Sequence, residues 1–200
     1  MQKQGHVGAL EWIEKFADQR NGVGRPLPTV LKRTGMEWYE LQDNEIAEIF
    51  TAMNPNQRLF FARFETPSFV NQRLVGLTHR ADYLDVELNH ALLNSMLTMF
   101  YIEASGFGRG LGVLDISKEG IANCYMLDPK LVSRDDRAKI IAAFEKLKGR
   151  QIMRVSEELE DSIRLDFEHT VLRSFGIDDY FEKIKSSLLS MQHTRITVKE

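Results

Sequence analysis

The sequence predicts an α+β fold, in which a mixed α/β body with a short sheet and a buried central helix is followed by an all-helical C-terminal tail. Two observations lead to this prediction. Apolar residues make up 43% of the 200 residues and include 12 Phe, which is enough to bury a core. Strand-like and helical patterns alternate as far as Asp128-Pro129, and only helical periodicity follows. We therefore expect two domains, residues 1–129 and 130–200.

The first 53 residues are expected to hold a helix, a loop and a strand. A helix is predicted over residues 8–19, with its apolar side chains on one face, ending at the turn signal Asn21-Gly22. Residues 21–36 are rich in Gly and Pro and predict an irregular, basic loop. A short strand is predicted over 37–41, and the pattern of 43–53 fits either a helix turn or a strand.

A β-hairpin is predicted next. Residues 58–64 and 69–78 are rich in strand-forming residues, and the segment 65–68 between them reads as a turn. Because side chains alternate between the two faces of a strand, Asn71 and Arg73 are expected on the same face of the second strand.

One long helix is predicted over residues 85–103. It is apolar nearly all round and should therefore lie buried at the centre of the body. A glycine-rich segment, 105–112, ends it, and we expect a strand over 111–117 and a short helix near 119–123.

The tail carries strong local helix signals. Ser133, followed three residues later by Asp136, resembles a capping box for a helix that ends at Gly149. Apolar residues then recur every four positions until Gly176, which is expected to close a second helix. Either Asp178 or Asp179 is expected to cap the last helix.

Positive charge is concentrated in two windows, although the chain as a whole carries −3. Residues 19–36 hold Arg and Lys without an acid, and residues 54–80 hold four Arg against one Glu. The two windows carry +7 together, so the remainder carries −10. This segregation would direct an anionic partner to one part of the surface. Chance fluctuation of charge in short windows is the alternative.

Motifs that would indicate catalysis or a cofactor are weak. The glycine-rich segment has its expected helix before it and its strand after it, the reverse of a phosphate-binding loop. The run 54–57, Asn-Pro-Asn-Gln, lacks the aromatic residue that an amino-methyltransferase motif uses to stack on a flipped base. No His, Cys and acid grouping has metal-ligand spacing. The single cysteine, Cys124, and the lack of a long apolar run suggest a cytoplasmic protein without a membrane span.

The order of several segments resembles the target-recognition region of adenine-specific DNA methyltransferases of restriction–modification systems. The run Leu92-Leu-Asn-Ser95, the aromatic helix end Phe100-Tyr-Ile-Glu103, the glycine-rich turn and Leu114-Asp-Ile-Ser117 are the most specific part. Residues 56–63 and 69–73 precede it, and Ile163-Arg-Leu-Asp-Phe167 resembles the family's helical tail. The resemblance spans about residues 10–195.

The resemblance implies sequence-specific binding to double-stranded DNA and no cofactor in this chain. S-adenosylmethionine would bind a catalytic domain whose motifs are absent here, so the chain would be either part of a longer enzyme or a separate subunit that needs a catalytic partner. The alternatives are a protein-interaction module without DNA binding and, less favoured by the motifs, a self-sufficient enzyme.

Cations and amide side chains before residue 110 supply the expected DNA contacts. Arg and Lys neutralise phosphates, whereas Arg can bind guanine bidentately and Asn or Gln can bind adenine in the same way. The residues expected on phosphates are Arg20, Arg25, Lys32, Arg33, Arg63 and Arg109. Those expected on base edges are Gln57, Arg58, Asn71 and Arg73.

Overall fold

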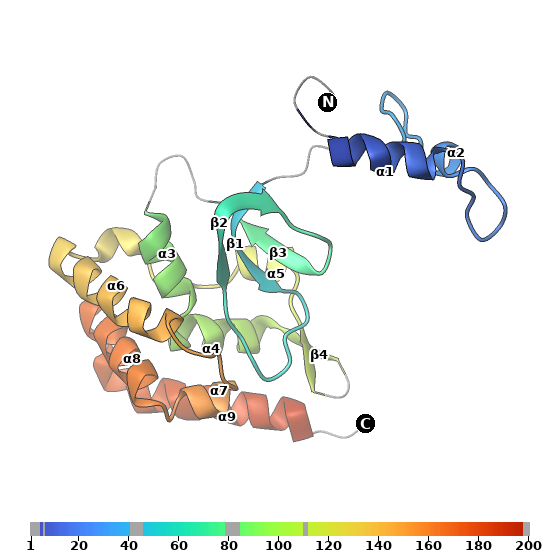
Figure 1. Ribbon diagram of the computed structural model, residues 1–200. Coiled ribbons are helices and arrows are strands. Elements are labelled where there is room, and N and C mark those ends of the chain that lie inside the picture. The colour runs from blue at the N-terminus through green and yellow to red at the C-terminus, as the bar shows by residue number, and fades with distance from the viewer. Residues whose placement is uncertain (1–4, 6, 41–45, 79–84, 110–111, 198–200) are drawn as a thin grey trace. The chain divides into compact units, whose positions relative to one another are not determined.

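The computed structural model describes residues 5, 7–40, 46–78, 85–109 and 112–197, and it confirms the α+β class. By compactness the chain forms two units, Met1–Glu45 and Ile46–Glu200 (Figure 1). We call them the N-terminal unit and the main unit and describe each by itself.

The N-terminal unit contains two helices and tight turns. Helix α1 (Val7–Ala17) confirms the predicted helix, and the short helix α2 (Leu27–Leu31) lies inside the predicted basic loop. The strand expected over 37–41 is wrong for its described part: residues 38 and 39 form a turn. There the Glu37 amide donates to the Glu40 carboxylate at 2.8 Å and the Glu40 amide donates to the Glu37 carbonyl, so the segment closes on itself.

The main unit contains a three-stranded sheet of order β2-β1-β3, in which β1 pairs antiparallel with both neighbours. The pattern of residues 43–53 fitted either a helix turn or a strand, and the structure has a strand there, β1 (Ile46–Ala52). Residues 43–45 lie outside the described residues. Its exposed and buried residues alternate, as expected for a strand with one face on a core.

The predicted hairpin is wrong, because the two strands do not pair with each other. β2 (Ala62–Phe69) runs straight through the expected turn at 65–68, and β3 (Leu74–Leu77) lies on the other side of β1. Pro67 lacks an N–H, but β2 is an edge strand and tolerates it. The actual turn lies between the strands, where Asn71 Oδ1 accepts from the Arg73 amide at 2.8 Å.

The long helix predicted over 85–103 is two helices, α3 (Val86–Leu93) and α4 (Met96–Ser105), so its continuity was predicted wrongly. The Asn94 side chain bonds Phe61, accepting from the amide at 3.0 Å and donating to the carbonyl at 2.9 Å. Ser95 then caps the second helix by accepting from the Thr98 amide. Both helices are largely buried, as predicted.

The glycine-rich segment leads into a second, two-stranded sheet. β4 (Phe107–Arg109) pairs antiparallel with β5 (Val113–Asp115), and residues 110–111 between them lie outside the described residues. The strand predicted over 111–117 is therefore present but shorter. The predicted short helix is α5 (Lys118–Ala122).

The tail is helical as predicted. After the 3-10 turn η2 (Pro129–Leu131) it contains α6 (Arg134–Lys148), α7 (Val155–Glu158), α8 (Ser162–Ser174), the 3-10 turn η3 (Asp178–Tyr180) and α9 (Phe181–Thr197). The Ser133 cap, the end at Gly149 and the left-handed Gly176 (φ +68°) are confirmed. The cap expected at Asp178 or Asp179 is wrong: both lie in η3, and the Asp178 carboxylate binds His169 and Arg173.

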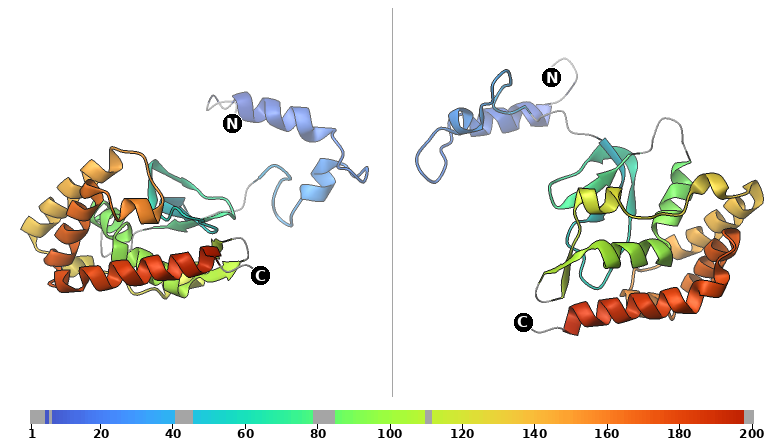
Figure 2. Two further views of the ribbon diagram at one scale, coloured as in Figure 1. Left: turned by 90° about the horizontal axis from the view of Figure 1, so that it is seen from below. Right: turned by 180° about the vertical axis from the view of Figure 1, so that it is seen from behind.

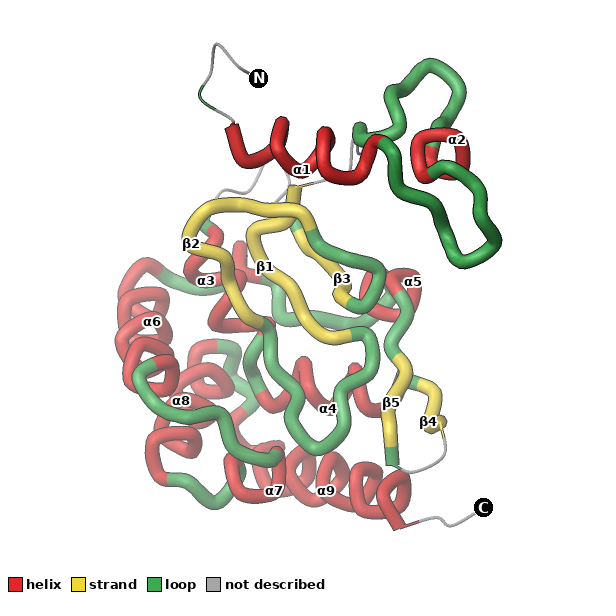
Figure 3. The backbone as a smooth tube through the Cα atoms, turned by 45° about the vertical axis from the view of Figure 1, so that its right-hand side comes forward, coloured by secondary structure: helices red, strands yellow, loops and turns green. Residues whose placement is uncertain are grey.

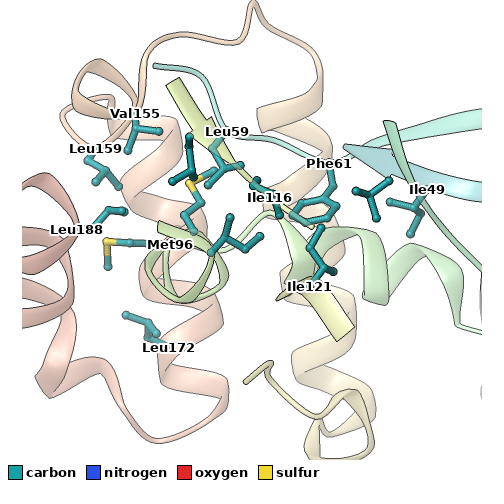
Figure 4. Close-up of a cluster of buried hydrophobic side chains, with 14 of the residues drawn as sticks. Ile49, Leu59, Phe61, Met96, Ile116, Ile121, Val155, Leu159, Leu172 and Leu188 are labelled. Carbon is teal, nitrogen blue, oxygen red and sulfur yellow. The ribbon is translucent and has the colours of Figure 1, made fainter. Parts of the chain in front are cut away.

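The tail helices share a hydrophobic core with the sheet (Figure 4). This core joins Ile49 of β1 and Phe61 to Leu159, Leu172 and Leu188 of the tail. Helix α9 packs along α4, and α6 packs against α8 (Figure 2). Figure 3 shows β1, β2 and β3 grouped together, with α6 and α8 side by side. The change in sequence character at residue 129 thus marks a change of secondary structure within one compact unit.

Candidate nucleic-acid interface

The basic loop of the N-terminal unit has a defined conformation. Asn21 Oδ1 accepts from the amides of Val23 (3.1 Å) and Arg25 (2.9 Å), and the Arg20 guanidinium donates to the Gly24 carbonyl at 2.8 Å. Gly24 has φ +80°, a conformation that favours glycine. These bonds fold residues 20–26 into a tight turn and hold the Arg25 backbone in place, while its side chain is exposed.

The other two cations of this loop lead into a second turn. Lys32 follows α2 directly, and Arg33 forms an isolated β-bridge with Met36. Gly35, inside that turn, has φ +77°. Lys32 and Arg33 are exposed, as are Arg20 and Arg25, so all four predicted phosphate contacts of this unit are open to solvent.

Aromatic side chains accompany these cations. The rings of Trp12 and Trp38 stack at 5.9 Å between centroids, Trp12 contacts Phe16 at 4.8 Å, and Trp38 contacts Tyr39 edge-on at 5.7 Å. Within the described part of this unit no residue reaches full burial, and Trp12 remains 49% exposed. Sequence reasoning did not assign this cluster a role, because its members come from two segments.

In the main unit, the loop between β1 and β2 carries Gln57 and Arg58. Its backbone is anchored on several sides: the Pro55 carbonyl accepts from the Leu114 amide (3.0 Å), and the Gln57 carbonyl accepts from the Val155 amide (2.9 Å). The Asn56 carbonyl accepts from the Arg195 guanidinium of α9 at 2.9 Å. The loop therefore presents the exposed Arg58 and the half-buried Gln57 on a fixed backbone.

Asn71 and Arg73 lie in the β2–β3 connection. The Arg73 carbonyl accepts from the Met53 amide at 2.9 Å, which places Arg73 beside the start of the loop that holds Gln57 and Arg58. Both Asn71 and Arg73 are exposed. Because Asn71 Oδ1 already accepts from the Arg73 amide, one of its two lone pairs remains for a base.

Arg63 and Arg109 are the remaining predicted phosphate contacts, and of these two the structure describes the side chain of Arg63. Arg63 lies on β2 opposite Ile49, with an exposed side chain that borders a cavity also lined by His90 and Lys148. Arg109 is in β4, and its side chain lies outside the described residues. The structure thus brings Arg73 to the loop of Gln57 and Arg58, whereas Arg20, Arg25, Lys32 and Arg33 belong to the other unit.

Ion pairing distinguishes the described cations of the two windows from most, though not all, of those of the tail. Within the part of the chain that the structure describes, no carboxylate pairs with Arg20, Arg25, Lys32, Arg33, Arg58, Arg63 or Arg73. In the tail, by contrast, ion pairs are formed by Arg137, Lys139, Lys146, Lys148, Arg150, Arg164, Arg173, Lys185 and Arg195. An unpaired, exposed cation keeps its full charge for an incoming anion.

The described residues offer little for metal or nucleophilic chemistry. Among them, no three His, Cys, Asp or Glu side chains are grouped to hold a metal ion. The Cys124 thiol is half-buried and donates to Ser105 Oγ at 3.7 Å. Of the helices that the structure describes, none is long and apolar enough to cross a bilayer.

Comparisons with protein-family models, curated proteins and solved structures gave no match to this chain.

Proposed function

We propose that this chain recognises a specific sequence of double-stranded DNA, as the specificity part of an adenine-specific methyltransferase whose catalytic domain is supplied in cis or by another subunit. The observation that carries the DNA part is that the seven described cations of the two windows, all exposed and all within residues 20–73, pair with no described carboxylate, whereas most cations of the tail do. The pairing with a catalytic domain that binds S-adenosylmethionine rests on the sequence resemblance.

The proposed division of labour follows from side-chain chemistry and backbone support. Arg20, Arg25, Lys32 and Arg33 would bind phosphates, which fixes the position of the domain without reading sequence. Gln57, Arg58 and Arg73 stand on backbone tied by hydrogen bonds to Val155 and Met53, and fixed donors are what base recognition requires.

Selection from a pool of random DNA duplexes tests this proposal. We expect the wild-type protein to enrich a common short sequence. A variant with Gln57, Arg58 and Arg73 changed to Ala should still bind DNA but lose about 1–3 kcal/mol of discrimination at each base pair that it no longer reads. The matched control replaces Lys118, Arg134 and Lys183, which are exposed and lie outside the two windows, and should enrich the wild-type sequence.

Each failure has a distinct meaning. If the wild-type protein retains no duplex even at low salt, the DNA proposal is overturned. If the base-reading variant enriches the wild-type sequence with the same preference, DNA binding stands but these three residues are not the readers.

A protein-interaction module is the second candidate. The aromatic cluster of Trp12, Phe16, Trp38 and Tyr39, in which Trp12 is 49% exposed and the others are half-buried, favours it, since aromatic residues are enriched at protein interfaces. The net charge of −3 points the same way. A protein that retains no duplex in the selection above would leave this candidate as the better supported one.

A further inference from the structure

A cavity of about 290 Å³ lies beside β2, next to the end of the loop that carries Gln57 and Arg58. Residues 59–63, α3, α6, α8 and the segment before α7 enclose it. Its lining includes buried residues, such as Phe61 and Arg164, and exposed ones, such as Arg63 and Ile152, so it has a closed end and a mouth. We call it the β2 cavity. Its volume is near the lower end of the range for small-molecule sites.

Much of the wall is apolar and aromatic. Phe61 and Phe144 line it together with Leu59, Met99 and Leu147. The His90 ring meets Phe144 edge-on at 4.9 Å between centroids, and His90 Nε2–H donates to the Phe61 carbonyl at 2.8 Å. Burial lowers the pKa of His90, so this ring adds a neutral, fixed surface to the wall. Such a wall suits a flat, apolar group.

The charged part of the lining is strongly asymmetric. Four cations, Arg63, Lys148, Arg150 and Arg164, line the cavity together with one carboxylate, that of Glu158. The other carboxylates that pair with these cations, Glu145, Asp161 and Glu168, are not among the lining residues. Lys148, Arg150 and Arg164 are thus ion-paired, which leaves Arg63 as the cation of this lining without a described carboxylate partner.

Two buried donors in this lining are unsatisfied. The Arg164 side chain is 3% exposed, and its Nη2 is used by Glu168 Oε1 (2.5 Å) and the Asn94 carbonyl (2.7 Å). Both Nη atoms of Arg150 bind Glu158, at 3.0 and 2.6 Å. The Nε atoms of Arg150 and Arg164 are buried and make no hydrogen bond to any described residue. Buried N–H groups are normally satisfied, so two orphan donors on arginines of one cavity require an explanation, such as a bound water or ion.

We propose that the β2 cavity binds a small organic anion, a flat apolar ring that carries a phosphate or carboxylate group. The ring would lie against Phe61 and Phe144. The anionic group would be bound by Arg63, which has no carboxylate partner among the described residues, with Lys148 beside it at the mouth. This inference assigns Arg63, one of the seven cations of the two windows, to the small anion, and it does not depend on DNA binding by the other six.

Calorimetric titration of the full chain, without DNA, tests the inference with phenyl phosphate, benzoate, inorganic phosphate and benzyl alcohol as probes. We expect at least one of the two ring-bearing anions to bind at least tenfold more tightly than inorganic phosphate and than benzyl alcohol. Better binding of phenyl phosphate or of benzoate identifies the anionic group. Equal binding of all four probes, or none by either ring-bearing anion, would overturn the proposal.

Variants locate the site. Arg63→Gln removes the unpaired cation from an exposed position, and Ile152→Glu puts a carboxylate at the mouth; each should weaken the better probe at least fivefold. The matched control is Arg134→Gln at the opposite end of α6 from Lys148, which should bind the probe as the wild type does. Circular dichroism and thermal unfolding verify the fold of each variant. Unchanged affinity in both Arg63→Gln and Ile152→Glu would refute the assignment of the cavity.

Discussion

Loss of the ion pair between Arg164 and Glu168 is the perturbation that most directly probes how the helical tail is joined to the rest of the main unit. Both side chains are buried, at 3% and 0% exposure, with 2.5 Å between Arg164 Nη2 and Glu168 Oε1. The two Glu168 oxygens also accept from the Met96 amide at 2.9 Å, at the first turn of α4. Replacing Glu168 with Gln would therefore leave Arg164 charged and buried without its closest carboxylate.

The expected cost follows from this geometry. Glu158 Oε2 is 3.9 Å from Arg164 Nη1 and is already bound by Arg150, so it compensates poorly. Removing one partner of a buried pair costs about 3–5 kcal/mol. For a chain of this size that lowers the melting temperature by about 6–20 °C, at about 2–4 °C per kcal/mol.

Urea denaturation and calorimetry of Glu168→Gln measure this loss of unfolding free energy. The control is Glu160→Gln, which removes a 69% exposed carboxylate from its pair with Lys185 and should cost less than about 1 kcal/mol. Burial raises the pKa of Glu168, and the Arg164 guanidinium and the Met96 amide oppose that effect. If Glu168→Gln costs no more than Glu160→Gln, the Glu168 carboxyl is protonated in the fold and our reasoning about a buried charge pair is refuted.

Two further predictions concern the main unit. Asp85 caps α3, and the hydrogen bond from Arg137 lowers the pKa of its carboxyl. The free energy of unfolding that this bond adds is therefore fully present above the ordinary Asp pKa and is lost as the pH falls through the lower pKa of the folded state. Asp85→Asn keeps the cap and should lose about 1–2 kcal/mol near pH 7 and progressively less as the pH falls below the ordinary Asp pKa, and an equal loss throughout that range in urea titrations would contradict this. Gly176 has φ +68° and open space around its α-carbon, so Gly176→Ala should cost about 1–2 kcal/mol from backbone strain alone, and Gly176→Asn less; equal stability of all three proteins in urea would contradict the assignment.

The helical tail could be predicted from sequence because its signals are local. The Ser133 cap, the stop at Gly149 and the left-handed Gly176 each depend on residues within one turn of the helix end. The same local reading predicted Asp178 or Asp179 as a cap, whereas both lie in η3, and His169 and Arg173, five or more residues away, bind the Asp178 carboxylate.

The sheet could not be predicted in the same way, because strand pairing is non-local. The turn residues at 65–68 favoured a hairpin, but β2 and β3 each gain a partner by flanking β1 instead. The break between α3 and α4 has a similar origin. Asn94 bonds Phe61, which is 33 residues away in sequence, and the sequence gives no local sign of that contact.

For the candidate interface, the sequence predicted which Arg and Lys side chains are exposed better than it predicted which of them lie close together. Arg and Lys in loops rich in Gly and Pro are exposed because such loops run over the surface, as Arg25 and Lys32 do. The gathering of Arg63 with Lys148, Arg150 and Arg164 was missed, since packing of α6 and α8 brings them together across about 100 residues of sequence.

The dependence of DNA affinity on salt tests the central claim most directly. The logarithm of affinity should fall linearly with the logarithm of salt concentration, by about 0.9 per phosphate contacted. Replacing Arg25, Lys32 and Arg33 with Gln should flatten this slope by up to about 3, while the same change at Lys118, Arg134 and Lys183 should leave it unaltered. A flat plot for the wild-type protein, or equal flattening by the two sets of substitutions, would contradict the proposal that these unpaired cations bind DNA phosphates.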